Sequence, residues 1–442
     1  MKNIRHTLLA AAIAAMLPIL ATAADYNIKD YGAVAKKLHL STAAIQKAID
    51  ECAAKGGGRV VVPKGKWLTG ALVLKSGVTL YLERKATLYG STDPRDYVLN
   101  KSAKIIMTSQ LIYAIQANNI GIAGEGTIDG QGAAFTDAAC NAVKITRPML
   151  IRFDTCKGIT VSGVTMRNAG VWVQHYYDCE NLTIKGITVF SHCNVCNDGI
   201  DITNCRNVLI TQSKIDSDDD AICLKTFSEK PCENVTVTDC VVATHCNALK
   251  IGSETVGDFR NIKFSNCKVV RSKSKKVING CAIAVAGIAV ESIDGARISN
   301  VSFSDISING TESPIFIRLG NRNDTYGHKP TKPQRGDING VTIKNVTVKN
   351  AGTTGSSITG IPGQTVKNIT LSNVIITHKG GQKERAIPKD NREKSEPNAM
   401  MWGTLPAQGI FVKYAENITT DEVNIRAKKA DKRPAIYRVN VK

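Results

Sequence analysis

Asn181-Leu182-Thr183-Ile184 is one copy of a short phrase that recurs along the chain, a polar turn residue followed by apolar residues at alternate positions. Other copies begin at Asn119, Gly158, Asn207, Asn234, Asn261, Asn300, Gly340 and Asn368, with a weaker one at Asn417. Alternation with period two predicts a strand, and a spacing of about 23 to 27 residues between the central copies predicts a solenoid. No helical stripe separates the copies, and the spacing of leucine-rich repeats is absent. We therefore predict an all-β fold, a single-stranded right-handed parallel β-helix.

The ends and turns of such a solenoid have their own sequence signals. Asn at the recurring turn tolerates the left-handed conformation and can form a side-chain ladder. Exposed strand edges at the ends must be covered. Residues Thr42–Ala54 are apolar along one helical face and precede Gly56-Gly57-Gly58, so we predict a short capping helix at the N-terminal end. Residues 380–397 have no apolar period and are predicted to form a long loop.

The first residues have the pattern of a signal peptide, with a basic start, an apolar stretch over residues 8–20 and a small-residue cleavage sequence at residues 21–23. We predict that residues 1–23 are removed, that residues 24–442 form one domain, and that the protein is secreted or periplasmic. Thirteen cysteines in an exported chain favour disulfides. Several of them recur at one place in the repeat, which favours stacked, buried thiols instead.

The charge balance indicates an anionic partner. The chain has 57 Lys and Arg against 38 Asp and Glu, a net charge of +19, and such an excess is typical of proteins that bind polyanions. The chain has no Arg-rich helix, so we expect an acidic polysaccharide or oligosaccharide as partner, with no nucleic acid and no membrane, and a monomer. The pair Cys193 and Cys196 has no second CxxC at zinc-ribbon spacing, and we expect no metal and no cofactor.

A group of aspartates is the candidate active site. Asp198 and Asp219 are 21 residues apart, about one coil, so they should lie on neighbouring rungs. Asp220 sits beside Asp219 at the turn, and alternation along residues 221–225 turns Lys225 outward with Asp219. Crowded carboxylates raise some of their pKa values, which leaves one protonated as general acid while others stay ionised. Glycoside hydrolysis needs such a pair, and the alternatives are a calcium site or a solvated acidic turn.

Several motifs in order resemble glycoside hydrolase family 28, the polygalacturonases and related pectin hydrolases. They are DYGA at residues 30–33, VVVPKG at 60–65, GEGTIDG at 124–130, NDGID at 197–201, DDAICLK at 219–225, IGSE at 251–254 and MMWGTLPA at 400–407. The resemblance covers nearly the whole mature chain and implies a pectin-lyase-like solenoid. It also implies an inverting hydrolase of pectic α-glycosidic bonds, with Asp219 as general acid and Asp198 and Asp220 activating water. Asp201, in NDGID, becomes a candidate substrate-binding residue.

The sequence departs from the family at two places. The family's Gly-His-Gly is replaced by a stretch in which His245 is the nearest imidazole and Asn247 follows, so we take His245 as a candidate catalytic residue and Asn247 as a candidate substrate-binding residue. The Arg-Ile-Lys that grips galacturonate is missing, and residues 287–291 read GIAVE. Lys250, Arg318 and Arg322 are the candidate substitutes, the two arginines as a bidentate clamp on a carboxylate. Lys225, which faces the groove, is a further candidate substrate-binding residue.

The missing cations leave alternatives open. The substrate could be rhamnogalacturonan or a substituted galacturonan in place of plain polygalacturonate. A pectate lyase, which uses calcium on clustered aspartates, would share the fold, and so would a β-helix that binds a polyanion without catalysis. Detection of new reducing ends, unsaturated products or binding alone separates these three.

Overall fold

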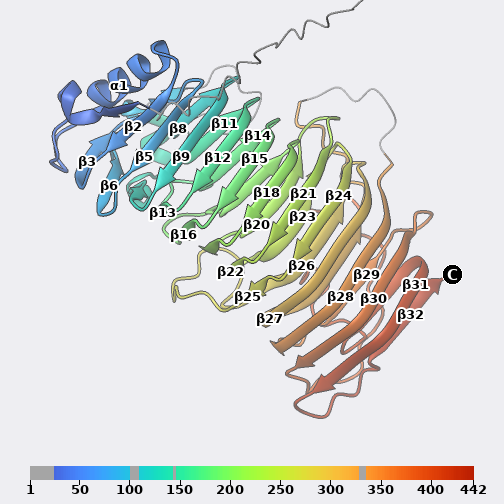
Figure 1. Cartoon of the computed structure of the whole chain (residues 1–442). Coiled ribbons are helices and arrows are strands. Elements are labelled where there is room, and N and C mark those ends of the chain that lie inside the picture. Colours follow the sequence, from blue (N-terminus) through green and yellow to red (C-terminus); the bar gives the residue numbers. More distant parts are fainter. Residues whose placement is uncertain (1–23, 100–108, 143–145, 328–334) are drawn as a thin grey trace, which may run out of the picture.

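The computed structural model describes residues 24–99, 109–142, 146–327 and 335–442; the predicted signal peptide lies outside the described residues. Its strands stack rung upon rung along one axis, from the helix at the N-terminal end to the C-terminus at the other end (Figure 1). The fold is a right-handed parallel β-helix, as the repeat predicted. No helix within the described ranges is long and apolar enough to cross a membrane.

Each coil contributes strands to three parallel faces. We call the face that carries the aspartates the site face. Two long strands contribute only a part to it: β27 contributes residues 311–319 and β31 contributes its first residues. Its strands are β4 (Leu72–Val73), β8 (Ser109–Ile115), β11 (Met149–Asp154), β14 (Gln174–Tyr177), β17 (Ile200–Thr203), β20 (Ile222–Thr226), β23 (Asn247–Thr255), β26 (Ala284–Ser292), β27 (Arg297–Leu319), β29 (Ser356–Thr359), β31 (Ile410–Ala427) and β32 (Ile436–Val441).

The second face holds the repeated phrase, and every copy of the phrase lies in a strand of this face. Its strands are β1 (Asp25–Asn27), β2 (Gly58–Val62), β5 (Val78–Leu82), β9 (Asn118–Gly124), β12 (Lys157–Ser162), β15 (Glu180–Lys185), β18 (Arg206–Thr211), β21 (Cys232–Thr238) and β24 (Phe259–Ser265), followed by parts of β27, β28 (Asp337–Ala351), β30 (Val366–His378) and β31.

The third face closes each coil. Its strands are β3 (Gly65–Thr69), β6 (Ala86–Gly90), β10 (Thr127–Asp129), β13 (Thr165–Arg167), β16 (Thr188–Ser191), β19 (Lys214–Ser217), β22 (Val241–Thr244) and β25 (Lys268–Val269), again followed by parts of the long strands β27, β28, β30 and β31. The short strand β7 (Val98–Leu99) pairs antiparallel with β8.

The interior is one continuous aliphatic core, because the apolar positions of all three faces point inward. At the recurring turn, Asn207, Asn234, Asn261 and Asn300 each donate a side-chain amide hydrogen bond to the asparagine of the preceding coil, at 2.7–3.1 Å. These asparagines have φ between 51° and 57°, the left-handed region that asparagine tolerates. The predicted asparagine ladder is therefore confirmed.

All thirteen cysteines are free thiols, so the disulfides suggested by export are not formed. Cys156, Cys179, Cys205 and Cys232 are buried one above another inside successive coils. Equivalent positions on stacked rungs point their side chains in parallel, and a disulfide needs two Cβ atoms directed at each other. These cysteines act as small core residues, as their recurrence predicted.

Helices and loops occur at the ends and edges of the coil. The predicted cap is α1 (Thr42–Ala54), which buries Ile45, Ala48, Ile49 and Cys52 against the first coils. A second short helix is α2 (Asp137–Ala142), and single 3-10 turns span Ile28–Tyr31, Pro94–Asp96 and Gly132–Ala134. Residues 379–409 form a loop without regular structure, and its Ala399 packs on the outer side of β26 and β27.

Candidate active site

Three aspartates meet where two strands of the site face begin. Asp198 precedes β17, Asp219 and Asp220 precede β20, and β17 and β20 are adjacent parallel strands. Each of the three side chains has an oxygen within 4.8 Å of the others. Main-chain hydrogen bonds fix the turns, because the Gly199 N–H donates to the carbonyl of Asp220 at 2.8 Å. One coil of sequence separation thus brings the three carboxyl groups together.

Two buried lysines flank this cluster, both of them sequence candidates. The Lys250 ammonium donates to Asp220 at 2.9 Å. Lys225 lies 3.0 Å from Glu254, 3.5 Å from Asp201 and 3.8 Å from Asp198. The structure therefore collects Lys225, Lys250 and Asp201 around the three aspartates.

Asn247 joins the same group. Both its backbone N–H and its side-chain amide donate to one oxygen of Asp220, at 3.1 and 2.7 Å. Together with Lys250 these donors stabilise the ionised form of Asp220. Burial acts in the opposite direction, but Lys250 and Lys225 outweigh it and hold the pKa of Asp220 below its usual range.

The pKa values of the other two aspartates are raised. Burial, reinforced by repulsion from Asp201 and Asp219, raises the pKa of Asp198 well above its usual range. Burial and the charge of Asp220 raise the pKa of Asp219 as well. A protonated carboxyl thus lies beside an ionised one, which is the arrangement that general acid–base catalysis needs.

Three further carboxyl groups surround the lysines. Burial raises the pKa of Asp201 to about 8, with Lys225 opposing it, and burial raises the pKa of Glu291 to about 8 against Lys250. For Glu254, Lys225 and Lys250 overcome burial and hold the pKa at about 2. The ionised carboxylates Asp220 and Glu254 therefore balance the two lysines, and the remaining acids stay largely protonated.

His245 does not contact these three aspartates directly. It is buried, and its Nδ1 lies 2.8 Å from Asp218, the residue before Asp219. His192 lies 2.8 Å from Asp216 and 3.6 Å from Asp218. Burial lowers the pKa of His192, but Asp216 and Asp218 overcome this and raise it. His245 therefore belongs to a buried His–Asp cluster that adjoins the candidate site through Asp218.

This cluster holds the loop between β25 and β26 against the aspartates. The backbone N–H groups of Ile278 and Asn279 donate to the two oxygens of Asp218, at 3.0 and 2.8 Å, and Lys273 N–H donates to Asp216 at 2.9 Å. The side-chain amide of Asn279 then donates to Asp219 at 2.6 Å. The loop thus places a hydrogen-bond donor on the candidate acid.

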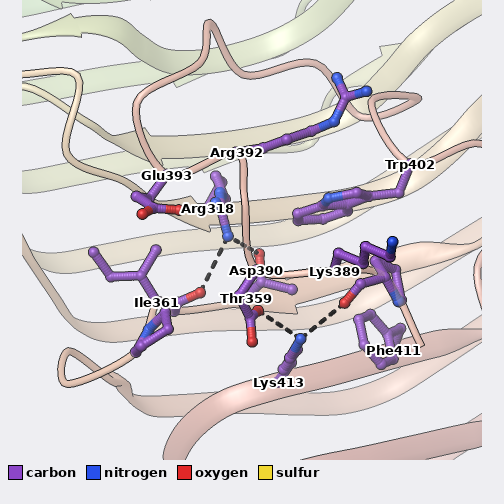
Figure 2. A pocket seen from close by; sticks show the side chains of 13 residues that line it. Arg318, Thr359, Ile361, Lys389, Asp390, Arg392, Glu393, Trp402, Phe411 and Lys413 are labelled. Carbon is purple, nitrogen blue, oxygen red and sulfur yellow. Dashed lines mark hydrogen bonds and ion pairs between the residues drawn. The ribbon is translucent and has the colours of Figure 1, made fainter.

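The two candidate arginines lie apart from this cluster and do not form the predicted clamp. Arg322 is paired with Asp294 at 2.5 Å and also contacts Glu396 and Tyr326. Because Asp294 is fully buried, Arg322 neutralises a structural carboxylate. Arg318 lies further along the site face, where its guanidinium donates to the carbonyl of Gly360 (Figure 2).

Within the described parts of the chain, two groups of side chains have the spacing of metal ligands: Asp198, Asp219 and Asp220, and His192, Asp218 and His245. In the first group Lys250 already occupies an oxygen of Asp220, and a dication there would have to displace it or tolerate its charge. In the second group Asp218 already accepts hydrogen bonds from two backbone N–H groups and from His245.

Some contributors were missed at the sequence level. Trp172 lies just before β14 at a position that no sequence motif marks, and the centre of its ring is 4.5 Å from the Lys225 ammonium. Glu254 stands in the IGSE motif and could have been named from it. Asn279 lies in a loop between coils, and no repeat position marks it.

Comparison with known proteins identifies the family of the chain. The profile of Glycosyl hydrolases family 28 matches residues 52–396. The chain is 27% identical to an endo-polygalacturonase of Pectobacterium parmentieri over 71% of this chain and 78% of the relative. It is 29% identical to a probable polygalacturonase of Vitis vinifera over 56% of this chain, and the match spans about half, 55%, of that relative's length. A hyperthermoactive exopolygalacturonase from Thermotoga maritima superposes with a TM-score of 0.71 at 22% identity, over 91% of this chain and 92% of that one.

Proposed function

The chain belongs to glycosyl hydrolases family 28, and we propose that this glycoside hydrolase cleaves an α-glycosidic bond in an acidic pectic polysaccharide of the galacturonan type. The observation that carries the proposal is the cluster of Asp198, Asp219 and Asp220, with oxygens within 4.8 Å and pKa values shifted in opposite directions. The polygalacturonase relatives support the substrate class.

We assign the roles from protonation and contact. Asp219 keeps its proton at higher pH than a free aspartate and protonates the leaving oxygen. Asp220 is ionised and deprotonates the attacking water, while Asp198 beside it keeps its proton to higher pH and orients that water. Lys225 and Lys250 lie next to the aspartates and supply ammonium donors for the hydroxyl or carboxylate groups of a uronate substrate, while Asp220 and Glu254 balance their charge.

The finer identity of the substrate depends on β26. The strand carries Glu291 in the stretch GIAVE, where the family resemblance leads us to expect Arg-Ile-Lys, and this carboxyl group is buried 3.9 Å from Lys250. A neutral carboxyl has no positive charge to attract a carboxylate but donates a hydrogen bond to a hydroxyl or an ester, which favours a rhamnogalacturonan or a substituted galacturonan as the second candidate. The leader-like residues 1–23 support secretion or a periplasmic location.

The test compares Asp219→Asn with wild type on polygalacturonate, rhamnogalacturonan and a substituted galacturonan, with new reducing ends as the readout. We expect the substitution to abolish hydrolysis while the melting temperature stays near that of wild type. Asp421→Asn, at an exposed position on β31, is the matched control and should retain full activity. Activity near wild type in Asp219→Asn would reject the assignment. Unsaturated products that depend on calcium would identify a lyase, and saturable binding without products would identify a binding protein.

A further inference from the structure

Arg318 is a buried cation without an ion pair. It lies on the outer side of β27 with 5% of its surface exposed, and only its Nη1 donates hydrogen bonds, to Gly360 O at 3.1 Å and Thr359 Oγ1 at 3.4 Å. Among the described residues no carboxylate lies within 4.0 Å of it; Asp390 and Glu393 act only from further away. A buried charge is costly unless it is paired, so this guanidinium needs an anion that the described chain does not provide.

Trp402 supplies a second unused donor in the same place. The Arg318 guanidinium lies over the Trp402 ring, 5.0 Å from its centre, and the two side chains lie next to each other in the pocket (Figure 2). The Nε1–H of Trp402 is buried and has no hydrogen-bond acceptor. A buried indole N–H normally finds a partner. An acceptor that enters the pocket beside this pair, at the edges that carry the N–H groups, would satisfy both donors.

The walls of the pocket are basic. Arg318, Lys389, Arg392 and Lys413 line it together with two acids, Asp390 and Glu393. The Lys413 ammonium donates hydrogen bonds to Asp390 at 2.6 Å and to Pro388 O at 2.9 Å. Because Asp390 already pairs with Lys413, the charge of Arg318 stays without a partner in the described part of the chain. The enclosed space is about 10 Å³, enough for one water-sized group such as a carboxylate oxygen and too small for a sugar ring.

The pocket is on the same face as the candidate active site. Starting from β20, the next strands of this face are β23, β26 and β27, and Arg318 is in register with Glu291 of β26. Three steps at about 4.8 Å place Arg318 roughly 14 Å along the axis from the strand of Asp220. This separation is too large for the sugar at the cleavage point and fits a more distant unit of a bound polymer.

We propose that the pocket of Arg318 and Trp402 is a distal subsite for the carboxylate of a uronate unit. The carboxylate accepts hydrogen bonds from the Nε–H and Nη2–H groups at the edge of the Arg318 guanidinium, which donate to no described residue, and from Trp402 Nε1–H. Its sugar ring lies outside, against the residue 379–409 loop. The substrate class in this inference rests on the proposed function. The subsite itself strengthens the binding of a long substrate chain and takes no part in bond cleavage.

The test measures binding in an Asp219→Asn background, so that it does not depend on turnover. Galacturonate oligomers of increasing length are titrated into this protein and into the same protein with Arg318→Gln. For oligomers long enough to span both sites, we expect Arg318→Gln to weaken the binding affinity about ten-fold or more. For the shortest oligomers we expect no change in affinity. Trp402→Phe keeps the ring and removes only the N–H, and we expect a smaller loss with the same length dependence.

Controls separate this result from general effects. Arg426→Gln removes the same charge from an exposed position on β31 and should leave affinity unchanged. Melting temperatures verify that each variant is folded, and Arg318→Lys, which keeps the charge and loses the planar fork, should recover only part of the affinity. Equal affinity of Arg318→Gln and wild type for long oligomers overturns the subsite, as does an equal loss for all lengths. If oligomers bind in this manner but wild type cleaves none of them, the proposed function fails and the subsite stands.

Discussion

The hydrogen bond from Asn279 to Asp219 gives the sharpest prediction about the reaction. Asn279 donates to the carboxylate at 2.6 Å and therefore favours its ionised form. Its backbone N–H, and not its side chain, anchors the loop to Asp218. Asn279→Ala thus removes one donor from the candidate acid while the anchor of the loop remains.

The expected change in the pKa of Asp219 follows from the strength of that hydrogen bond. A hydrogen bond to a charged group contributes about 1.5 to 3 kcal/mol, and about 1.4 kcal/mol corresponds to one pKa unit. Removal of the donor destabilises the ionised form, so the pKa of Asp219 rises by about one to two units. Because Asp219 acts as the acid, it must be protonated, and the alkaline limb of kcat/KM should move to higher pH by that amount.

The assay is the pH profile of kcat/KM on the best substrate, compared with Val277→Ala, a neutral change at an exposed position of the same loop. The control should reproduce the wild-type profile. An alkaline limb that stays in place in Asn279→Ala would show that Asp219 does not set it. A shift to lower pH would contradict the sign of the argument.

Three further predictions concern stability and stereochemistry. Arg322→Ala leaves the buried Asp294 unpaired, so denaturant unfolding should show a loss of about 3 to 5 kcal/mol while KM stays unchanged; an altered KM would return Arg322 to the substrate site. Asp201 has a pKa of about 8 in the folded protein against an ordinary 3.8, so the stability it contributes below pH 4 is lost as pH rises to 8. The melting temperature should therefore fall less between pH 5 and 8 in Asp201→Asn than in wild type, and an equal fall would refute this pKa. Inverting carboxylate pairs usually lie about 6.5 to 9.5 Å apart, while in this cluster one oxygen of each aspartate lies within 4.8 Å of the others, and the family resemblance implies inversion. Proton NMR of the first product should show the β-anomer, and an initial α-anomer would indicate a double displacement through a covalent intermediate.

The fold could be predicted because its signal is local and repeated. The phrase of Asn207 and Val208 alternates with period two, and each further copy adds the same strand to the same face. The cap helix Thr42–Ala54 was predicted at the residues where it occurs, since its apolar spacing and the glycines after it are local features. The expectation of disulfides was wrong because it was based on the predicted export of the protein and on the number of cysteines. Whether two cysteines pair depends on the direction of their side chains.

The site could be predicted only where it follows the repeat. A separation of one coil is enough to bring Asp198 next to Asp219, since the period of a solenoid converts sequence distance into position along the axis. The contacts of His245, Arg322 and Asn279 do not follow from the period. Each depends on a loop or turn whose course is not repeated.

The sequence by itself therefore determined the solenoid, its cap and the meeting of the aspartates, because periodic patterning and rung spacing are properties of the chain. Tertiary structure alone decided which carboxyl groups keep their protons, since that depends on burial and on lysines from neighbouring coils. It also decided that Arg322 is paired and that Arg318 is not, because the acids that reach one arginine and stay away from the other come from turns and loops that the repeat does not place.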